Sequence, residues 1–211
     1  MKIPPPDRSY VIWFTPRTGS TLLTKTLSQL GVAGTPGEHL NIAQDQTLDG
    51  HYQVDSFEGL CEAMWQTGAG DDSGIMAMKY SYATGWHDRL TADLARLRGK
   101  GPLDPMDWHS WETIFPRTKH VFLTRRHRLN LVASWWKARQ DSQWHREPGE
   151  AAKGEDCYAD KYDVNALTHL LKDHLMRETA TQAFFDQNGI APYTLVYEDM
   201  VADFAGTLTR L

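Results

Sequence analysis

The chain has 211 residues and a formal net charge of −5 at pH 7. This length suits a single domain over residues 1–211 with a substantial core, in which residues 1–8 form a flexible leader. The acidic balance argues against a nucleic-acid-binding protein, which presents a strongly basic surface. No apolar run reaches the roughly 18 residues of a membrane span, and the amino terminus lacks a signal-peptide core, so we expect a cytoplasmic protein with no membrane span.

The first predicted elements are a strand, a tight polar loop and a helix. Residues 10–14 are aromatic or β-branched throughout, which is typical of a buried strand. The polar loop follows at residues 15–21. Leucines then recur at helical spacing over residues 23–30, and Gly31 occupies a position where a glycine commonly ends a helix.

The loop at residues 15–21 has the sequence TPRTGST. Between a strand and a helix, such a loop points several backbone N–H groups at one spot, and the positive end of the helix dipole adds to their field. Arg17 contributes a permanent positive charge and a forked set of donors. The Gly-Lys pair of the common nucleotide-binding loop is missing. The sequence therefore predicts an anion site of a different type; the alternative is a polar connection that binds nothing.

Strands and helices continue to alternate along the chain. Further strands are predicted at residues 75–80, 120–124 and 192–197. Helical spacing of apolar residues predicts helices at residues 57–64, 86–97, 107–115, 129–143 and 163–185. In the last helix the predicted buried stripe consists of Leu167, Leu170, Leu171, Leu175 and Met176.

This alternation predicts an α/β fold of the P-loop-like type. Helices are expected to cover both faces of a central parallel sheet, in a three-layer α/β/α arrangement. The sequence ends at Leu211 within a helical pattern that has no capping residue, so we expect the complete protein to continue beyond this point.

A second cationic segment follows the strand at residues 120–124. This strand leads into Arg125 and Arg126, where a strand that serves a magnesium site would end in aspartate. Ser134 follows Arg126 by eight residues, on the next predicted helix. Ligands of open parallel sheets lie beyond the carboxyl ends of the strands. Two anion sites at neighbouring strand ends predict a nucleoside with phosphates at both ends; the alternative for Arg126 is a solvated charge at a helix start.

Taken together, these motifs resemble the bacterial trehalose 2-sulfotransferase-like family. The matching segments are PRTGSTLL at residues 16–23, GVAG-x-P-x-E at residues 31–38 and the double-arginine segment at residues 123–134. The resemblance covers residues 10–140, and the YED sequence at residues 197–199 resembles a later strand end of many sulfotransferases. It implies the sulfotransferase fold, often as a homodimer. It also implies sulfuryl transfer to a carbohydrate hydroxyl from 3′-phosphoadenosine 5′-phosphosulfate (PAPS), with no metal.

The resemblance implies binding roles for individual residues. The 5′-phosphosulfate end of PAPS would lie against Arg17, Thr18, Gly19, Ser20 and Thr21. The 3′-phosphate would bind Arg126 and Ser134.

Glu38 matches the general base proposed for the family. A sugar hydroxyl is a poor nucleophile that must lose its proton as the S–O bond forms, and a carboxylate can accept that proton. Arg17 would stabilise the negative charge that builds on the departing phosphate. His39 is a rival base because the ordinary imidazole pKa lies near neutrality. The alternative for Glu38 is a carboxylate in a solvated loop.

Lys79 ends the strand predicted at residues 75–80 and is a further catalytic candidate, as a contact for the transferred sulfuryl group. The alternative is a lysine whose stem packs at the edge of the core. His39 and Leu40 stand where the family tends to be aromatic, which separates this sequence from the trehalose-specific pattern.

The acceptor pocket is predicted from residues 39–60, the tryptophan-rich residues 86–111 and the long loop at residues 144–160. Candidate acceptor contacts are His39, Trp108 and Trp111. The nine histidines are scattered without metal-ligand spacing, so no metal site is expected.

Two other functions are consistent with these motifs. A P-loop small-molecule kinase is disfavoured by the missing Gly-Lys pair and by the arginine-ended second strand. A non-catalytic nucleotide-binding relative could have kept the loop and lost the chemistry.

Overall fold

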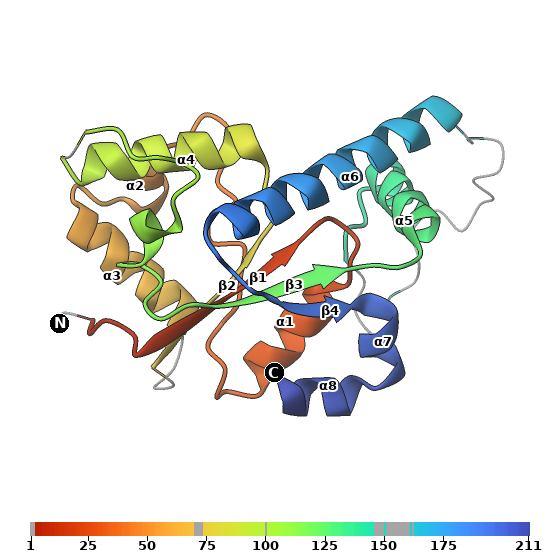
Figure 1. The fold of residues 1–211 in the computed structure, drawn as a ribbon, viewed down its shortest axis with the longest axis horizontal. Helices are drawn as coiled ribbons and strands as arrows, with labels where there is room; N and C mark the ends of the chain where they lie inside the picture. Colours follow the sequence, from red (N-terminus) through yellow and green to blue (C-terminus); the bar gives the residue numbers. More distant parts are fainter. Residues whose placement is uncertain (1–2, 70–73, 100, 146–149, 151–160, 162) are drawn as a thin grey trace.

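The structure is a computed structural model that describes residues 3–69, 74–99, 101–145, 150, 161 and 163–211. At its centre is a sheet whose four described strands are all parallel and lie in the order β2-β1-β3-β4 (Figure 1). The strands are β1 (Arg8–Phe14), β2 (Ile75–Tyr80), β3 (Lys119–Thr124) and β4 (Tyr193–Val196).

The parallel register brings the carboxyl ends of the strands to one edge of the sheet. Ile12 of β1 lies opposite Lys79 of β2, and Phe14 of β1 lies opposite Leu123 of β3. The last residues of β3 and β4 also pair with each other. The segments that follow these strands, which the sequence predicts to bind ligand, therefore begin on the same side of the molecule.

The strands predicted at residues 75–80 and 120–124 are confirmed. β1 begins at Arg8, inside the predicted leader, and Asp7 N donates to the carbonyl before β2 at 2.8 Å. β4 is shorter than predicted, because the backbone turns into a helix at Tyr197.

Helices surround this sheet on both sides. They are α1 (Ser20–Gln29), α2 (Leu48–Tyr52), α3 (Phe57–Ala69), α4 (Thr84–Leu97), α5 (Arg128–Asp141), α6 (Val164–Gln187), α7 (Tyr197–Ala202) and α8 (Phe204–Arg210). The helices predicted at residues 86–97, 129–143 and 163–185 are confirmed. Residues 107–115 hold a short 3₁₀ turn, η1 (Trp108–Trp111), in place of the predicted helix.

Alternate side chains of β1 serve the two faces of the sheet, as the period of a strand requires. Val11 and Trp13 are fully buried and enter a core that is completed by α2, α3, α4, η1 and the end of α6. Ile12 and Phe14 enter a second core, formed with α1, β3 and the carboxyl-terminal helices. The three-layer α/β/α architecture predicted from the sequence is therefore confirmed.

The buried stripe of α6 differs from the prediction. Leu170 is buried, but Leu175 is 36% exposed and Met176 is 71% exposed. The helix packs its first half on α5 and its last turns on the sheet, where Phe184 and Phe185 are fully buried (Figure 1). Since α6 packs first on α5 and then on the sheet, no single stripe of leucines can face both of these partners.

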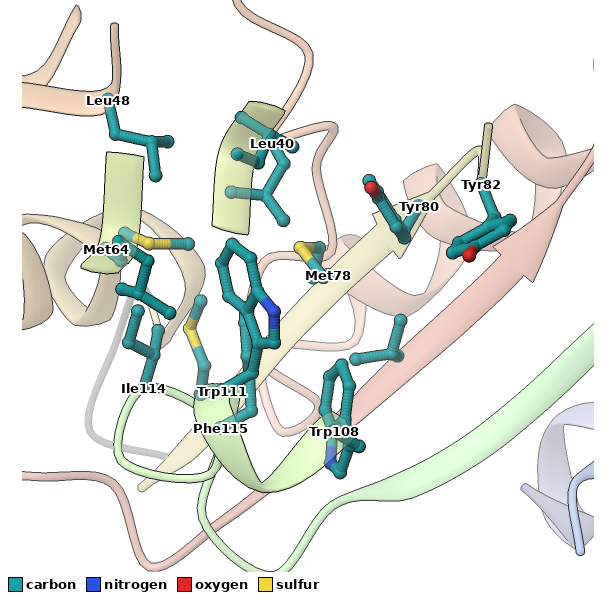
Figure 2. Close-up of a cluster of buried hydrophobic side chains, with 14 of the residues drawn as sticks. Leu40, Leu48, Met64, Met78, Tyr80, Tyr82, Trp108, Trp111, Ile114 and Phe115 are labelled. Atoms are coloured by element: carbon teal, nitrogen blue, oxygen red, sulfur yellow. The ribbon is translucent and has the colours of Figure 1, made fainter. Parts of the chain in front are cut away.

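Trp108 and Trp111, predicted to contact an acceptor, are instead core residues (Figure 2). They are 7% and 1% exposed, and Phe115 lies against both rings. Trp108 lies against Trp13 of β1 and Phe184 of α6, so the apolar rings of this segment complete the larger core. The prediction that these indoles bind substrate is not supported by their position, because neither lines the groove described below.

Histidines in this aromatic core should make the protein less stable in acid. Trp13 Nε1 donates to His120 Nδ1 at 3.0 Å, so this nitrogen must be unprotonated. Burial lowers the pKa of His120 to about 4 and that of His87 to about 4. The unfolded chain, with imidazole pKa values of about 6.5, binds more protons, so stability is lost as the pH falls from about 6.5 towards 4.

We expect each of these two histidines to cost about 2 kcal/mol of unfolding free energy at pH 5 relative to pH 7.5. Urea unfolding at both pH values measures this difference, and His120→Gln should reduce it by about one histidine's share. An unchanged difference in this variant would contradict the assignment.

Candidate functional site

A groove with a volume of about 1600 Å³ lies along the carboxyl ends of the strands. It is lined by the loop after β1, part of α1, residues 38–44, the end of β2 and residues that follow β3 and α5. Of the predicted site residues, its lining contains Arg17, Gly19, Ser20, Thr21, Glu38, Lys79 and Ser134. The structure therefore brings together most of the residues singled out in the sequence.

The loop after β1 turns sharply through two left-handed residues, Arg17 with φ 70° and Gly19 with φ 87°. Between them, Thr18 is fully buried and its Oγ1 donates to Thr15 O at 2.8 Å, which fixes the turn from inside. α1 then begins at Ser20, with no side-chain cap and no acidic residue in its first turn. Its first amides are therefore disposed to bind an anion.

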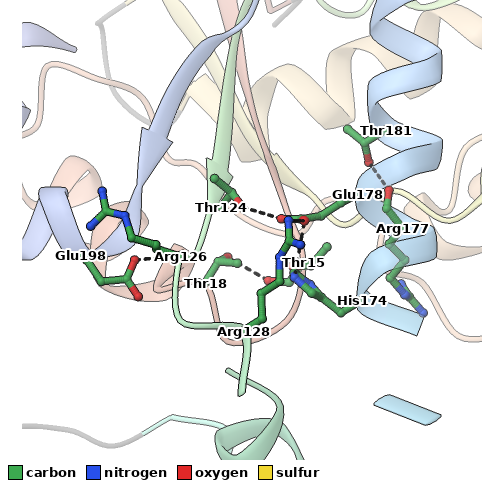
Figure 3. Close-up of polar contacts among 10 residues, drawn as sticks. All are labelled: Thr15, Thr18, Thr124, Arg126, Arg128, His174, Arg177, Glu178, Thr181 and Glu198. Carbon is green, nitrogen blue, oxygen red and sulfur yellow. Dashed lines mark hydrogen bonds and ion pairs between the residues drawn. The ribbon is translucent and has the colours of Figure 1, made fainter. Parts of the chain in front are cut away.

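A buried polar network holds this loop from behind (Figure 3). Thr15 Oγ1 lies 2.9 Å from His174 Nδ1, and His174 Nε2 lies 3.5 Å from Glu178 on the same face of α6. Glu178 also accepts hydrogen bonds from Thr124, at the end of β3, and from Arg128. Burial lowers the pKa of His174, against the opposing effect of Glu178. Sequence reasoning missed this network, whose one local signal is the i, i+4 spacing of His174 and Glu178.

Two arginines of the groove lining, Arg17 and Arg125, contact each other. Arg17 Nε donates to Ser134 Oγ at 2.9 Å, and Arg125 Nη1 donates to Arg17 O at 3.1 Å. The Arg125 guanidinium also lies over the Tyr197 ring, 4.6 Å from its centroid. Burial lowers the pKa of Arg17, and the nearby Arg125 lowers it further. Two cations this close favour an anion beside them.

Arg126 is turned away from this pair. Its Nη2 donates to both oxygens of Asp199, at 2.9 and 2.7 Å, and the side chain is absent from the groove lining. The backbone N–H groups of Arg126 and His127 donate to Glu198. Arg126 and Ser134, which are predicted to bind the same 3′-phosphate, thus have different partners, since Ser134 contacts Arg17. Arg125, which the sequence marked as cationic without giving it a separate role, is the arginine of this segment that lines the groove.

Lys79 and Glu38 form an ion pair inside the groove. Lys79 Nζ lies 2.9 Å from Glu38 Oε1 and donates to Thr21 Oγ1 at 3.2 Å. The other oxygen, Glu38 Oε2, accepts from Asn41 Nδ2 at 2.8 Å. The pair forms because Lys79 N donates to Gly37 O at 2.9 Å, which lays this loop beside the end of β2.

His39 contacts the backbone of the loop that carries Glu38. Its Nε2 lies 3.0 Å from Thr35 O and 3.2 Å from Gly37 N, and burial lowers the pKa of the ring. The side chain is absent from the groove lining, unlike Glu38. As an acceptor contact or rival base, His39 is therefore not supported by its position.

Among the residues that the structure describes, no group of three or more His, Cys, Asp or Glu side chains could hold a metal ion. In the same described segments, every helix is too short or too polar to cross a bilayer.

The parallel sheet, the uncapped helix start and the clustered cations define an α/β protein with a cationic groove at the carboxyl ends of its strands. The Stf0 sulphotransferase family matches residues 9–210, and the chain belongs to this family. The resemblance to sulfotransferases inferred from the loop and the double-arginine segment is thereby confirmed.

One similar solved structure is the sulfotransferase domain from the olefin synthase of Synechococcus PCC 7002. The two share 18% identity over 97% of this chain and 71% of that chain, with a TM-score of 0.42. Comparison with curated proteins found no significant match.

Gly19→Ala should damage the loop specifically. The left-handed backbone is strained for alanine, and its Cβ would lie 2.4 Å from Tyr197 Cδ2. We expect the free energy of unfolding to fall by about 1–3 kcal/mol. We also expect the affinity for adenosine 3′,5′-bisphosphate (PAP) to fall by roughly tenfold or more. Urea unfolding and calorimetry measure the two effects.

Gly85→Ala is the matched control, because a Cβ there meets nothing within 4 Å. It lies in α4 and should leave stability equal or higher by about 0.5–1 kcal/mol. Equal behaviour of the two variants would contradict the proposed constraint.

Proposed function

We propose that this protein transfers a sulfuryl group from PAPS to a hydroxyl of a carbohydrate or similar polyhydroxyl acceptor. The observation that carries the proposal is the ion pair between Lys79 and Glu38, whose Nζ and Oε1 atoms lie 2.9 Å apart. In the proposal, Lys79 is the cation that contacts the sulfuryl group and Glu38 is the base that accepts the proton of the acceptor. Membership of a sulphotransferase family supplies the reaction class. The cytoplasmic location and the homodimer remain predictions from the sequence and the family.

The amides that follow Arg17 would hold the 5′ end of the donor. Arg17 is already fixed by Ser134 and by the carbonyl of Trp144, so little side-chain freedom is lost when an anion binds. Its charge, with that of Arg125, would stabilise the negative charge that develops on the bridging phosphate oxygen.

Glu38 and Lys79 would couple proton transfer to charge stabilisation. As the acceptor oxygen bonds to sulfur and the bond from sulfur to the phosphate oxygen breaks, the acceptor proton passes to Glu38. Neutralised Glu38 no longer holds Lys79, whose ammonium is then free to stabilise the departing oxygen. The ion pair thus places the positive charge where it is needed late in the reaction.

The 3′-phosphate would bind Arg126 and Ser134, as the resemblance implies. Both partners of the Arg126–Asp199 pair are more than half exposed, at 55% and 63%. An exposed ion pair of this kind contributes little energy, so a phosphate could replace Asp199 at low cost.

The acceptor would occupy the remaining part of the groove. A volume of about 1600 Å³ exceeds the roughly 300–1000 Å³ of a pocket for one small ligand, which leaves room for two substrates. Residues from all three predicted acceptor segments line it, among them Asn41, Trp86 and Trp144. Ser81 Oγ is buried in this lining and has no hydrogen-bond partner among the described residues, so it is available to bind a substrate hydroxyl.

Calorimetry with PAP and with Mg-ATP separates a sulfotransferase from a kinase. We expect PAP to bind and PAPS-dependent turnover to appear in a screen of sugar acceptors. Tight binding of Mg-ATP without binding of PAP would refute the proposal in favour of the kinase.

Glu38→Gln should retain PAP affinity and lower kcat by about 10²–10⁴, because the amide cannot accept the acceptor proton. Turnover assays and PAP titrations give the two quantities. Glu112→Gln, at an exposed carboxylate outside the groove, is the control and should keep full activity. A kcat within twofold of the parent for Glu38→Gln would remove Glu38 from the role of base.

Arg126→Ala should weaken PAP binding by about tenfold or more while leaving adenosine 5′-phosphosulfate, which has no 3′-phosphate, nearly unaffected. Asp199→Asn removes the competing carboxylate and should not weaken PAP. Equal losses for both ligands in Arg126→Ala would show that this residue does not bind the 3′-phosphate.

A further inference from the structure

One histidine of the groove has no role in the transfer scheme above. Among the described residues, His145 is the only histidine in the groove lining. It lies beyond the carboxyl end of α5, where Ser142 takes a left-handed conformation with φ 55° and turns the chain away from the helix axis. No local motif in the sequence distinguishes it from the other eight histidines.

The position of His145 follows from the contacts of Arg17. Arg17 donates through Nε to Ser134 on α5 and through Nη1 to the carbonyl of Trp144. These two bonds tie the segment after α5 to the anion-binding loop. The residue after Trp144 is therefore held in the groove close to Arg17, which the proposed function assigns to the 5′ end of the donor.

Charged groups from four parts of the groove act electrostatically on His145. Lys79 comes from β2, Arg17 from the loop after β1 and Lys25 from α1, while Glu38 comes from the loop beside β2. Partial burial lowers the pKa of the imidazole, Lys79 and Arg17 lower it further, and Glu38 acts in the opposite direction. Without a ligand, the ring is thus neutral at neutral pH.

The geometry points to His145 as a further ligand for the phosphosulfate end of the donor, one that takes up a proton as this anion binds. This inference rests on the proposed function. A bound anion offsets the charge of Lys79 and Arg17, so the imidazole regains its affinity for a proton. The resulting imidazolium can donate a charge-assisted hydrogen bond to the anion. His145 would thus contact the donor, whereas Glu38 would serve the acceptor.

The direction of the pH effect follows from linkage. The proton affinity of His145 is higher in the complex than in the free protein, so binding tightens as the pH falls through the ordinary imidazole value of about 6.5. Proton uptake is greatest between the pKa of the free protein and that of the complex. At about pH 8.5 the ring is largely neutral in both states, and its contribution to binding is small.

The test is calorimetric titration of the whole protein with PAP at about pH 6.5, in buffers that differ in ionisation enthalpy. PAP phosphates can also exchange protons on binding, so the quantity of interest is the difference between wild type and His145→Gln. We expect His145→Gln to take up fewer protons and to bind PAP about tenfold more weakly near pH 6, with little change near pH 8.5. His169→Gln, at an exposed histidine of α6, is the control and should match the wild type.

His145→Lys carries a charge at every pH tested. It should keep wild-type affinity near pH 6 and, like His145→Gln, lose the proton uptake. Equal proton uptake by wild type and His145→Gln would overturn the inference. So would an equal loss of PAP affinity in His145→Gln at both pH values. Either result would leave the proposed function standing. Failure of the wild type to bind PAP would overturn the proposed function and the inference with it.

Discussion

The backbone at Gly19 is the constraint on which the site depends. This residue must adopt a left-handed conformation, and the Tyr197 ring leaves no space for a Cβ above it. Gly19 directly precedes α1, so this geometry decides where the first amides of the helix point. The Tyr197 ring in turn lies against the guanidinium of Arg125. A contact between Gly19 and Tyr197, far apart in the sequence, thus positions both the first amides of α1 and a neighbouring cation.

The site is cationic although the protein as a whole is acidic. Arg17, Lys79 and Arg125 gather at one edge of a sheet in a chain whose net charge is −5. The parallel register explains this concentration, because it gathers residues that follow different strands at one place. Glu38 forms an ion pair with Lys79, which offsets part of the repulsion among the cations of the groove. In the proposed reaction, a proton on this carboxylate would release the lysine, and proton transfer to Glu38 would thereby be linked to stabilisation of the leaving group.

Histidines of this protein take different states because their surroundings differ. His120 and His174 are neutral in packed surroundings, where each is hydrogen-bonded to another side chain. His145 is kept neutral by cations as well as by burial, and an anion would reverse the effect of those cations. His120 and His174 therefore support the packing of the fold, whereas His145, in the inference above, responds to a ligand.

The sequence by itself determined the alternation of strands and helices, the parallel sheet and the tight polar loop before α1, because these depend on short-range patterns of apolar residues, glycine and charge. It also indicated the family and the grouping of Arg17, Glu38 and Lys79 at the strand ends. Only the tertiary structure decided that Trp108 and Trp111 are core residues, since an indole has the same local pattern in a core and in a binding cleft. It likewise decided that Ser134 contacts Arg17 and that Tyr197 and His145 reach the groove. These contacts join residues far apart in the chain, and packing between elements, which no local pattern records, brings them together.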